Sequence, residues 1–317
     1  MPKKKSQRSP FSSRAAGKKP RRAPFGSSSR RGAVASRRAD PKGGAGVSSG
    51  RPARRPRQAE RNSLRQPANL EKIFGKHSCR AVLKTRPRAV RRLLLLHGKL
   101  EPPAEFLEMA EAAGIAPEIL GWEEFLREGD FQEEENHQGV CLFARQRELL
   151  AEKDLKSLAG ARVVLALDQL SDPRNLGAIL RGAAFFGVDA VLLLKNRAAP
   201  ITPAVTRIAV GGAEFVKIFE VTNLARSLDL LKKLGFWVFG LDERGEKSLA
   251  EADFGEKAVL VIGAEGEGLR QRTAEFCDEL VKIPGGRAGV ESLNAAVAAT
   301  IALAEVFRGG SARGTVG

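Results

Sequence analysis

The sequence predicts an α/β fold with a parallel sheet, because continuous apolar runs alternate with helical segments through its C-terminal half. Strands that are apolar on both faces are typical of a parallel sheet covered by helices on each side. The expected strands are 163–167, 190–194, 216–219, 237–240, 258–262 and 280–283. The expected helices are 176–186, 202–215, 223–234, 268–277 and 293–307. We therefore expect one large α/β domain over residues 161–309, followed by a tail at 310–317.

A second, smaller set of alternating elements precedes the large domain and predicts a small α/β domain over residues 71–146. Apolar residues from Ile73 to Leu83 fall at helical spacing around His77. Later elements are expected as strands at 91–96, 118–120 and 139–143, a helix at 104–113 and a helical turn at 122–127. Residues 147–160 are charged and helix-prone, and we interpret them as a linker.

The basic charge of the chain is concentrated at its start. The 317 residues carry a net charge of +16, and residues 1–70 hold 20 lysines and arginines against two acids, Asp40 and Glu60. The other 247 residues are close to neutral, with 33 basic and 35 acidic side chains. A segment rich in Arg, Ser, Gly and Pro cannot bury enough apolar surface to fold, so disorder is expected. Such an arm suits electrostatic capture of nucleic acid; a solubilising tail or an organellar transit peptide is the alternative.

Cysteine and apolar content limit the possible classes of protein. The three cysteines lie far apart and there are only three histidines, which indicates neither a disulfide framework nor a zinc site. No apolar run approaches the ~18–20 residues needed to span a bilayer, so no membrane partner is expected. A cytoplasmic protein is the first expectation, and an organellar one follows if the basic arm is a transit peptide.

Polar residues gather where three expected strands end, which is where ligands bind in open parallel sheets. After the strand at 163–167, Asn175 stands at the opening of the helix expected at 176–186, and Arg181 lies on that helix six residues further on. Asn175 could equally be a plain helix cap, and Arg181 a solvated helix residue. The turn between them and the strand has no glycine pattern for a dinucleotide, and the chain has no phosphate-binding GxxxxGK[ST] loop.

The second strand end is rich in glycine and acid. Gly263, Gly266 and Gly268 follow the strand at 258–262 and would let backbone approach a ligand closely. Glu265 and Glu267 would repel a phosphate, so a cationic ligand is the better electrostatic match. A simple capping role for Glu265 is the alternative.

The third strand end combines polar residues with a buried helix. Ile283 and Pro284 lead into a glycine-rich loop, and Ser292 and Asn294 precede an alanine-rich segment. Helices apolar on all sides are buried, inside a domain or at a subunit interface. Ser292 and Asn294 are either helix caps or part of a polar group that positions substrate.

Taken together, these three segments resemble the motifs of the SpoU (TrmH-type) branch of the SPOUT RNA methyltransferases. The Asn175–Arg181 spacing is similar to the first motif, 263–269 to the second, and Ile283-Pro284 with 292–294 to the third. The match extends over about 150 residues in the family's order. It departs at Gly285, where the family commonly has methionine, and in a loop before Ser292 that is one residue longer than usual.

The resemblance implies a trefoil-knotted sheet, S-adenosylmethionine as the methyl donor, no metal, and methylation of a ribose 2′-hydroxyl. It implies catalytic or positioning roles for Arg181, Asn175, Glu265, Ser292 and Asn294. It implies cofactor contacts from Gly263, Ala264, Glu265, Gly268, Ile283, Pro284 and Leu293. The implied partners are RNA and a second copy of the chain in a homodimer. The resemblance favours large-subunit rRNA as the RNA and a guanosine as the methylated nucleotide. A tRNA target, or a noncatalytic RNA-binding factor on the same fold, is the alternative.

Overall fold

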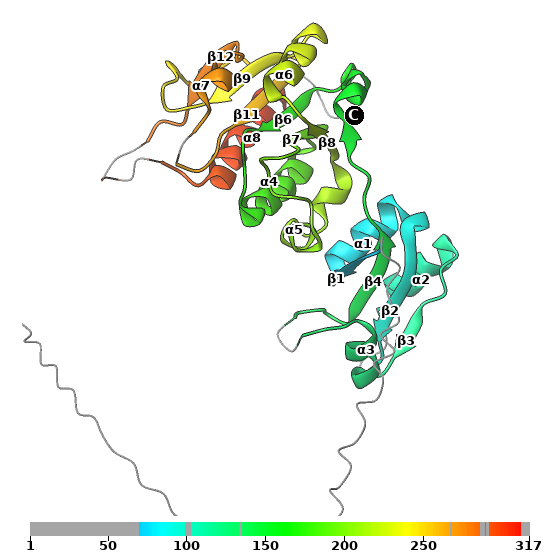
Figure 1. Ribbon diagram of the computed structural model, residues 1–317. Coiled ribbons are helices and arrows are strands. Elements are labelled where there is room, and N and C mark those ends of the chain that lie inside the picture. The colour runs from blue at the N-terminus through cyan, green and yellow to red at the C-terminus, as the bar shows by residue number, and fades with distance from the viewer. Residues whose placement is uncertain are drawn as a thin grey trace, which may run out of the picture. The chain divides into compact units, whose positions relative to one another are not determined.

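The computed structural model describes residues 70–98, 103–132, 135–266, 268–285, 289 and 292–311. Apart from Leu70, the basic arm predicted over 1–70 lies outside the described residues, as does most of the predicted tail. The described elements form a four-stranded sheet in the order β1-β4-β2-β3 and an eight-stranded sheet in the order β10-β12-β9-β11-β6-β7-β8-β5 (Figure 1). No helix among these residues is both long and apolar enough to cross a membrane.

The four-stranded sheet forms the smaller α/β part of the chain. Its strands are β1 (Leu70–Phe74), β2 (Val90–Leu96), β3 (Glu118–Leu120) and β4 (Val140–Arg145). Central β4 runs antiparallel to β1 and β2, while β2 and β3 are parallel. Its helices are α1 (Lys76–Thr85), η1 (Pro87–Ala89), α2 (Ala104–Ala113) and α3 (Trp122–Glu128). Helices α1 and α2 pack on one face of the sheet, and Phe125 of α3 packs on the other.

One expectation for this part is wrong. Ile73 and Phe74 do not begin a helix, because they pair with Leu142 and Cys141 in the ladder between β1 and β4. The helix starts only after Gly75, whose φ of 87° turns the chain out of the strand. Both residues are buried, and burial decided their structure over local spacing.

The eight-stranded sheet is parallel throughout, as the continuous apolar runs predict. Its strands are β5 (Leu150–Ala151), β6 (Val163–Leu167), β7 (Ala190–Leu194), β8 (Lys217–Val221), β9 (Trp237–Leu241), β10 (Lys247–Ser248), β11 (Ala258–Ile262) and β12 (Glu279–Lys282). Two of these strands were not expected. β5 arises within the predicted linker and pairs with β8, while β10 pairs with β12 at the other end of the sheet.

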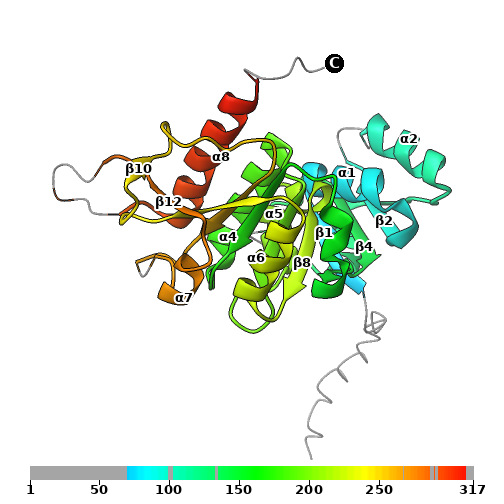
Figure 2. The ribbon, with the colours of Figure 1, turned by 90° about the horizontal axis from the view of Figure 1, so that it is seen from above.

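Helices cover both faces of this sheet (Figure 2). One face packs against α4 (Pro173–Phe186), α5 (Pro203–Ile208) and α8 (Ala295–Ser311). The other packs against η2 (Glu152–Leu158), α6 (Leu224–Lys233) and α7 (Gln271–Ala274). The central strands β6, β7 and β11 are buried throughout, which gives the sheet an apolar layer on each side.

Two of the expected helices are shorter than predicted. The one expected at 202–215 ends at Ile208, because Val210 and Gly211 take φ values of 54° and 78°, and η3 (Gly212–Phe215) follows. At Gly211 a Cβ atom would lie 2.6 Å from the Cβ of Ala81, so the break lets α1 pack closely against this turn. The one expected at 268–277 is the single turn α7, since 263–268 forms a loop.

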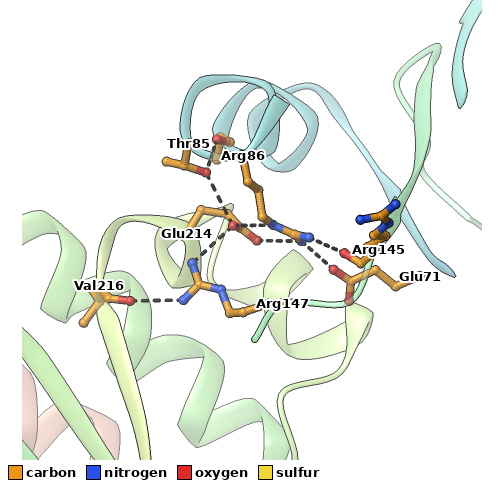
Figure 3. Close-up of polar contacts among 8 residues, drawn as sticks. Glu71, Thr85, Arg86, Arg145, Arg147, Glu214 and Val216 are labelled. Atoms are coloured by element: carbon orange, nitrogen blue, oxygen red, sulfur yellow. Dashed lines mark hydrogen bonds and ion pairs between the residues drawn. The ribbon is translucent and has the colours of Figure 1, made fainter. Parts of the chain in front are cut away.

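A buried ion cluster joins the four-stranded part to the eight-stranded part (Figure 3). The Glu214 carboxylate, 1% exposed, accepts hydrogen bonds from Arg86 Nε at 2.9 Å and from Arg147 Nη2 at 3.2 Å. Arg86 also donates to Glu71 of β1 and to the carbonyl of Arg145. Burial raises the pKa of Glu71, and the hydrogen bond from Arg86 opposes that rise. Two guanidinium groups and two carboxylates therefore balance inside the contact.

Candidate functional site

The site is built where β6 leads into α4. Asp172 caps α4 by accepting from the Arg174 backbone N–H at 2.8 Å, and Pro173 occupies the first helical position. The capping interpretation of Asn175 is therefore wrong, because Asp172 fills that role. Asn175 lies in the first turn with its side chain buried, at 6% exposure, so its amide needs partners.

Those partners come from the other two motifs. Asn175 Nδ2 donates to Glu265 Oε2 at 2.9 Å, and Asn175 Oδ1 accepts from Asn294 Nδ2 at 2.8 Å. The three side chains form one directed chain of hydrogen bonds, from Asn294 through Asn175 to Glu265. The residues are 90 and 119 positions apart in sequence, so the fold alone brings them together.

Asn294 has a second function as the cap of α8. Its Oδ1 accepts from the backbone N–H groups of Ala296 at 2.9 Å and Val297 at 3.3 Å. The cap fixes the amide so that its Nδ2 points at Asn175. Of the alternatives weighed for Asn294, the helix cap is confirmed, and its role as a site residue stays a prediction. Ser292, by contrast, is exposed, and among the described residues no hydrogen bond joins it to this chain.

The loop from Gly263 to Gly268 is closed on itself. Ala264 and Gly268 exchange two backbone hydrogen bonds, of 3.2 and 3.0 Å, and Gly266 and Gly268 have φ values of 85° and 67°. A Cβ atom on Gly263 would lie 2.2 Å from the carbonyl carbon of Gly268, so only glycine fits there. The loop thus presents backbone and the exposed Glu265 side chain at the end of β11.

Two aspartates hold this loop on either side, and the motifs did not predict them. Asp168, the residue after β6, is buried and accepts from Arg270 Nε at 2.8 Å. Asp242, the residue after β9, accepts from Arg244 Nε and Nη2, each at 2.7 Å, and these bonds lower the pKa of Asp242. Their signal in the sequence is an acid directly after a buried apolar run.

Arg181 stands apart from the hydrogen-bonded chain. It is exposed on α4, and among the described residues no hydrogen bond or ion pair holds its side chain. Its backbone is tightly packed, since a Cβ atom on Gly212 would lie 3.1 Å from the Arg181 Cα. The fold therefore brings together Asn175, Glu265 and Asn294 but leaves the Arg181 guanidinium open.

The remaining residues predicted to contact the cofactor take no part in the hydrogen-bonded series Asn294–Asn175–Glu265. Ile283 is half-buried and Pro284 is exposed after β12, and Leu293 is 45% exposed before α8. Ala264 and Gly268 belong to the closed loop. Within the part of the chain that the structure describes, no three His, Cys, Asp or Glu side chains gather as a metal site would require. The polar groups available for binding a ligand here are side-chain amides, one carboxylate and backbone groups.

Two family models match the chain in succession. Residues 72–150 match the model described as RNA 2′-O ribose methyltransferase substrate binding, and residues 162–304 match the SpoU rRNA methylase family. The first covers the four-stranded sheet from within β1 and reaches the start of β5. The second spans the large sheet from β6 to β12 and most of α8.

Curated relatives and solved structures agree with these models. The chain is 38% identical over 245 residues to the 23S rRNA (guanosine-2′-O-)-methyltransferase RlmB of Pseudomonas putida, across 76% of this chain and 97% of that protein. It is 38% identical over 246 residues to the Coxiella burnetii protein of the same name, across 76% and 96%. The fold matches the SpoU methyltransferase AviRb from Streptomyces viridochromogenes, solved with AdoMet, with a TM-score of 0.63 and 24% identity over 78% of this chain and 92% of that one. The chain belongs to the SpoU rRNA methylase family.

Proposed function

We propose that the protein transfers a methyl group from S-adenosylmethionine to a ribose 2′-hydroxyl of RNA, at a guanosine of 23S-type rRNA. The observation that carries this proposal is the chain Asn294–Asn175–Glu265, which links all three motifs at one edge of the sheet. The relatives at 38% identity are named for this reaction, and they align over nearly their whole length. Bacterial relatives named for rRNA also favour a cytoplasmic location.

The residues of the glycine loop fit the cofactor. When bound, S-adenosylmethionine supplies an electrophilic methyl group on a cationic sulfonium, and it carries no phosphate. Gly263 has no side chain, so the Gly268 backbone packs directly against it and the loop keeps its closed shape. The Glu265 carboxylate suits a cationic ligand, and its bond to Asn175 fixes its direction. Ile283, Pro284 and Leu293 would supply the apolar contacts.

Arg181 is proposed to act on the RNA. Attack by a 2′-hydroxyl requires loss of its proton, and guanidinium groups remain protonated in proteins. We therefore assign Arg181 the binding of the neighbouring phosphate and stabilisation of the developing alkoxide, while the proton passes to solvent water rather than to Arg181. The guanidinium is exposed and has no partner among the residues that the structure describes, which supports this role, since its partner would arrive with the substrate. Ser292 would orient the ribose from the start of α8.

The active form is proposed to be a homodimer packed through α4 and α8. Phe185 is 82% exposed on α4, Leu293 is 45% exposed just before α8, and Val297 is 47% exposed in its first turn. Exposed apolar groups on two adjacent helices indicate a protein interface. Val297→Glu should convert the protein to a monomer in sedimentation experiments, whereas Val297→Ala should not. A dimer in both variants would place the interface elsewhere.

The proposed division of labour follows the sequence domains. Residues 71–146 would bind RNA, 147–160 would connect, and 161–309 would carry out methyl transfer. The arm 1–70 would capture RNA through its positive charge, because it holds 20 basic residues and only two acids. The order β10-β12-β9, in which β12 lies between two earlier strands, supports the trefoil knot implied by the family.

Calorimetric titration with S-adenosylmethionine, followed by methylation of a 23S rRNA transcript, tests the proposal. Asn175→Ala should lower kcat by about 100-fold, because a displaced reacting geometry costs that much. Asn196→Ala, a change at an exposed asparagine of a neighbouring loop, is the matched control and should leave kcat unchanged. Arg181→Ala should abolish transfer while cofactor binding persists. Absence of cofactor binding by the unaltered protein would refute the proposal.

A further inference from the structure

Two arginines converge on one neutral side chain at the carboxyl edge of the large sheet. Arg197 follows β7, and Arg270 follows the glycine loop after β11. With its amide oriented for hydrogen bonding, the Gln169 oxygen accepts from Arg197 Nη1 at 2.9 Å and from Arg270 Nη1 at 3.2 Å. Two guanidinium groups therefore share a single amide oxygen.

The charges of this group do not balance. Asp168 is buried and pairs with Arg270, with an Nε–Oδ1 distance of 2.8 Å. Arg197 is exposed, and among the residues that the structure describes no carboxylate forms an ion pair with it. Asp168 neutralises Arg270, and among the described residues no carboxylate neutralises Arg197, so the two neighbouring guanidinium groups repel each other. The group is consequently complementary to an anion that would contact both arginines.

The backbone holds this arrangement in place before any ligand binds. Gln169 has a φ of 62°, in the left-handed region that a residue with a Cβ atom rarely adopts. Next to it, Leu170 O accepts from the Ala199 N–H at 2.8 Å, so the loops after β6 and β7 are tied together. Conformations of this kind persist where surrounding structure fixes them, and they concentrate at ligand sites.

Gln169 and Arg270 lie on two loops that also lead to candidate active-site residues. The loop after β6 carries Gln169 and continues to Asn175, while the loop after β11 carries Glu265 and continues to Arg270. Because β11, β6 and β7 are neighbours in a parallel sheet, these loops leave the same edge. An anion bound by the arginines would therefore lie beside the residues that hold the ribose and the methyl donor.

We propose that Arg197 and Arg270 form a subsite for one backbone phosphodiester of the RNA substrate, a proposal that rests on the proposed function. Guanidinium groups bind phosphate oxygens through paired N–H donors, and such contacts set the register of a nucleic acid on a protein. The buried Asp168 fixes Arg270, and Gln169 aligns Arg197 with it. The subsite would position the strand next to the methylated nucleotide.

The test uses the full-length protein, tritiated S-adenosylmethionine and a 23S rRNA transcript over a series of KCl concentrations. Arg197→Gln should lower kcat/KM by about tenfold, as loss of a charge-assisted hydrogen bond does. It should also reduce the slope of log kcat/KM against log[KCl] by about 0.7, for one lost phosphate contact. Arg197→Lys keeps the charge, so it should retain the slope while losing part of the rate.

Arg162→Gln is the matched control, because Arg162 is exposed and directly precedes β6, at the opposite edge of the sheet. Equal effects of Arg162→Gln and Arg197→Gln would overturn the subsite. So would a loss of S-adenosylmethionine affinity in Arg197→Gln, since the pair would then bind the cofactor carboxylate. Filter binding of the same transcript tests the subsite separately, because it measures RNA affinity without methyl transfer. If the unaltered protein transfers no methyl group, the proposed function fails. The subsite then stands or falls on whether Arg197→Gln weakens RNA binding.

Discussion

The ion cluster around Glu214 makes a quantitative prediction about how the two sheets are joined. Glu214→Gln keeps the shape of the side chain but removes the charge that faces Arg86 and Arg147. Loss of one partner from a buried ion pair costs about 3–5 kcal/mol. The amide keeps one accepting oxygen, and Glu71 still neutralises Arg86. We therefore expect the lower end of that range, a loss of about 3 kcal/mol in the free energy of unfolding.

The two tryptophans of the chain allow each part to be followed separately. Trp122 lies in α3 of the four-stranded part, and Trp237 lies in β9 of the large sheet. With Trp237→Phe as background, urea unfolding followed by Trp122 fluorescence should show a lower midpoint in Glu214→Gln. Glu256→Gln, at an exposed glutamate, controls for the same change elsewhere. If both variants unfold at the same urea concentration, the cluster contributes nothing and the reasoning is wrong.

Three further results are expected. Gly263→Ala should cost about 1–3 kcal/mol in unfolding free energy and weaken S-adenosylmethionine binding by calorimetry, because its Cβ would lie 2.2 Å from Gly268; unchanged affinity would contradict the close-approach argument. Since Arg244 lowers the pKa of Asp242 below its ordinary 3.8, the pair stabilises the fold above that pH, and the stabilisation is lost as the pH falls through the folded-state pKa. Asp242→Asn should therefore be less stable than the unaltered protein at about pH 7, and the difference should shrink as the pH falls through the folded-state pKa of Asp242. Deleting residues 1–68 should weaken RNA binding and flatten its salt dependence in filter binding, while cofactor affinity stays the same; a collapse of cofactor affinity would show that the boundary is wrong.

Much of the large sheet could be predicted because its main strands are apolar on both faces. β6, β7 and β11 are five-residue runs, and all their residues are buried. β5 and β10 have two residues each, too few to show any periodicity. Their pairing depends on partners elsewhere in the chain, which a local pattern does not contain.

Some residues of the candidate site and its surroundings could be predicted from the sequence, and others could not. Asn175, Glu265 and Asn294 were predicted because they lie at strand ends in a recognisable order, and the structure joins them by hydrogen bonds. Their roles in catalysis remain predictions. Glu214 could not have been predicted, because in the sequence it is one polar residue in an amphipathic segment. Its partner Arg86 is 128 residues away, and only the packed structure shows that its charge is buried.

A single short segment links the ion cluster to the candidate catalytic arginine. η3 contains both Gly212, which abuts the Cα of Arg181, and Glu214, which holds Arg86. One residue, Ala213, separates the contact with α4 from the contact with the four-stranded part. Because packed segments shift as units, a change in the partners of Glu214 strains the backbone against which Arg181 rests. Glu214→Gln should therefore lower kcat for RNA methylation as well as stability, and unchanged kcat in a folded variant would show that the two contacts are independent.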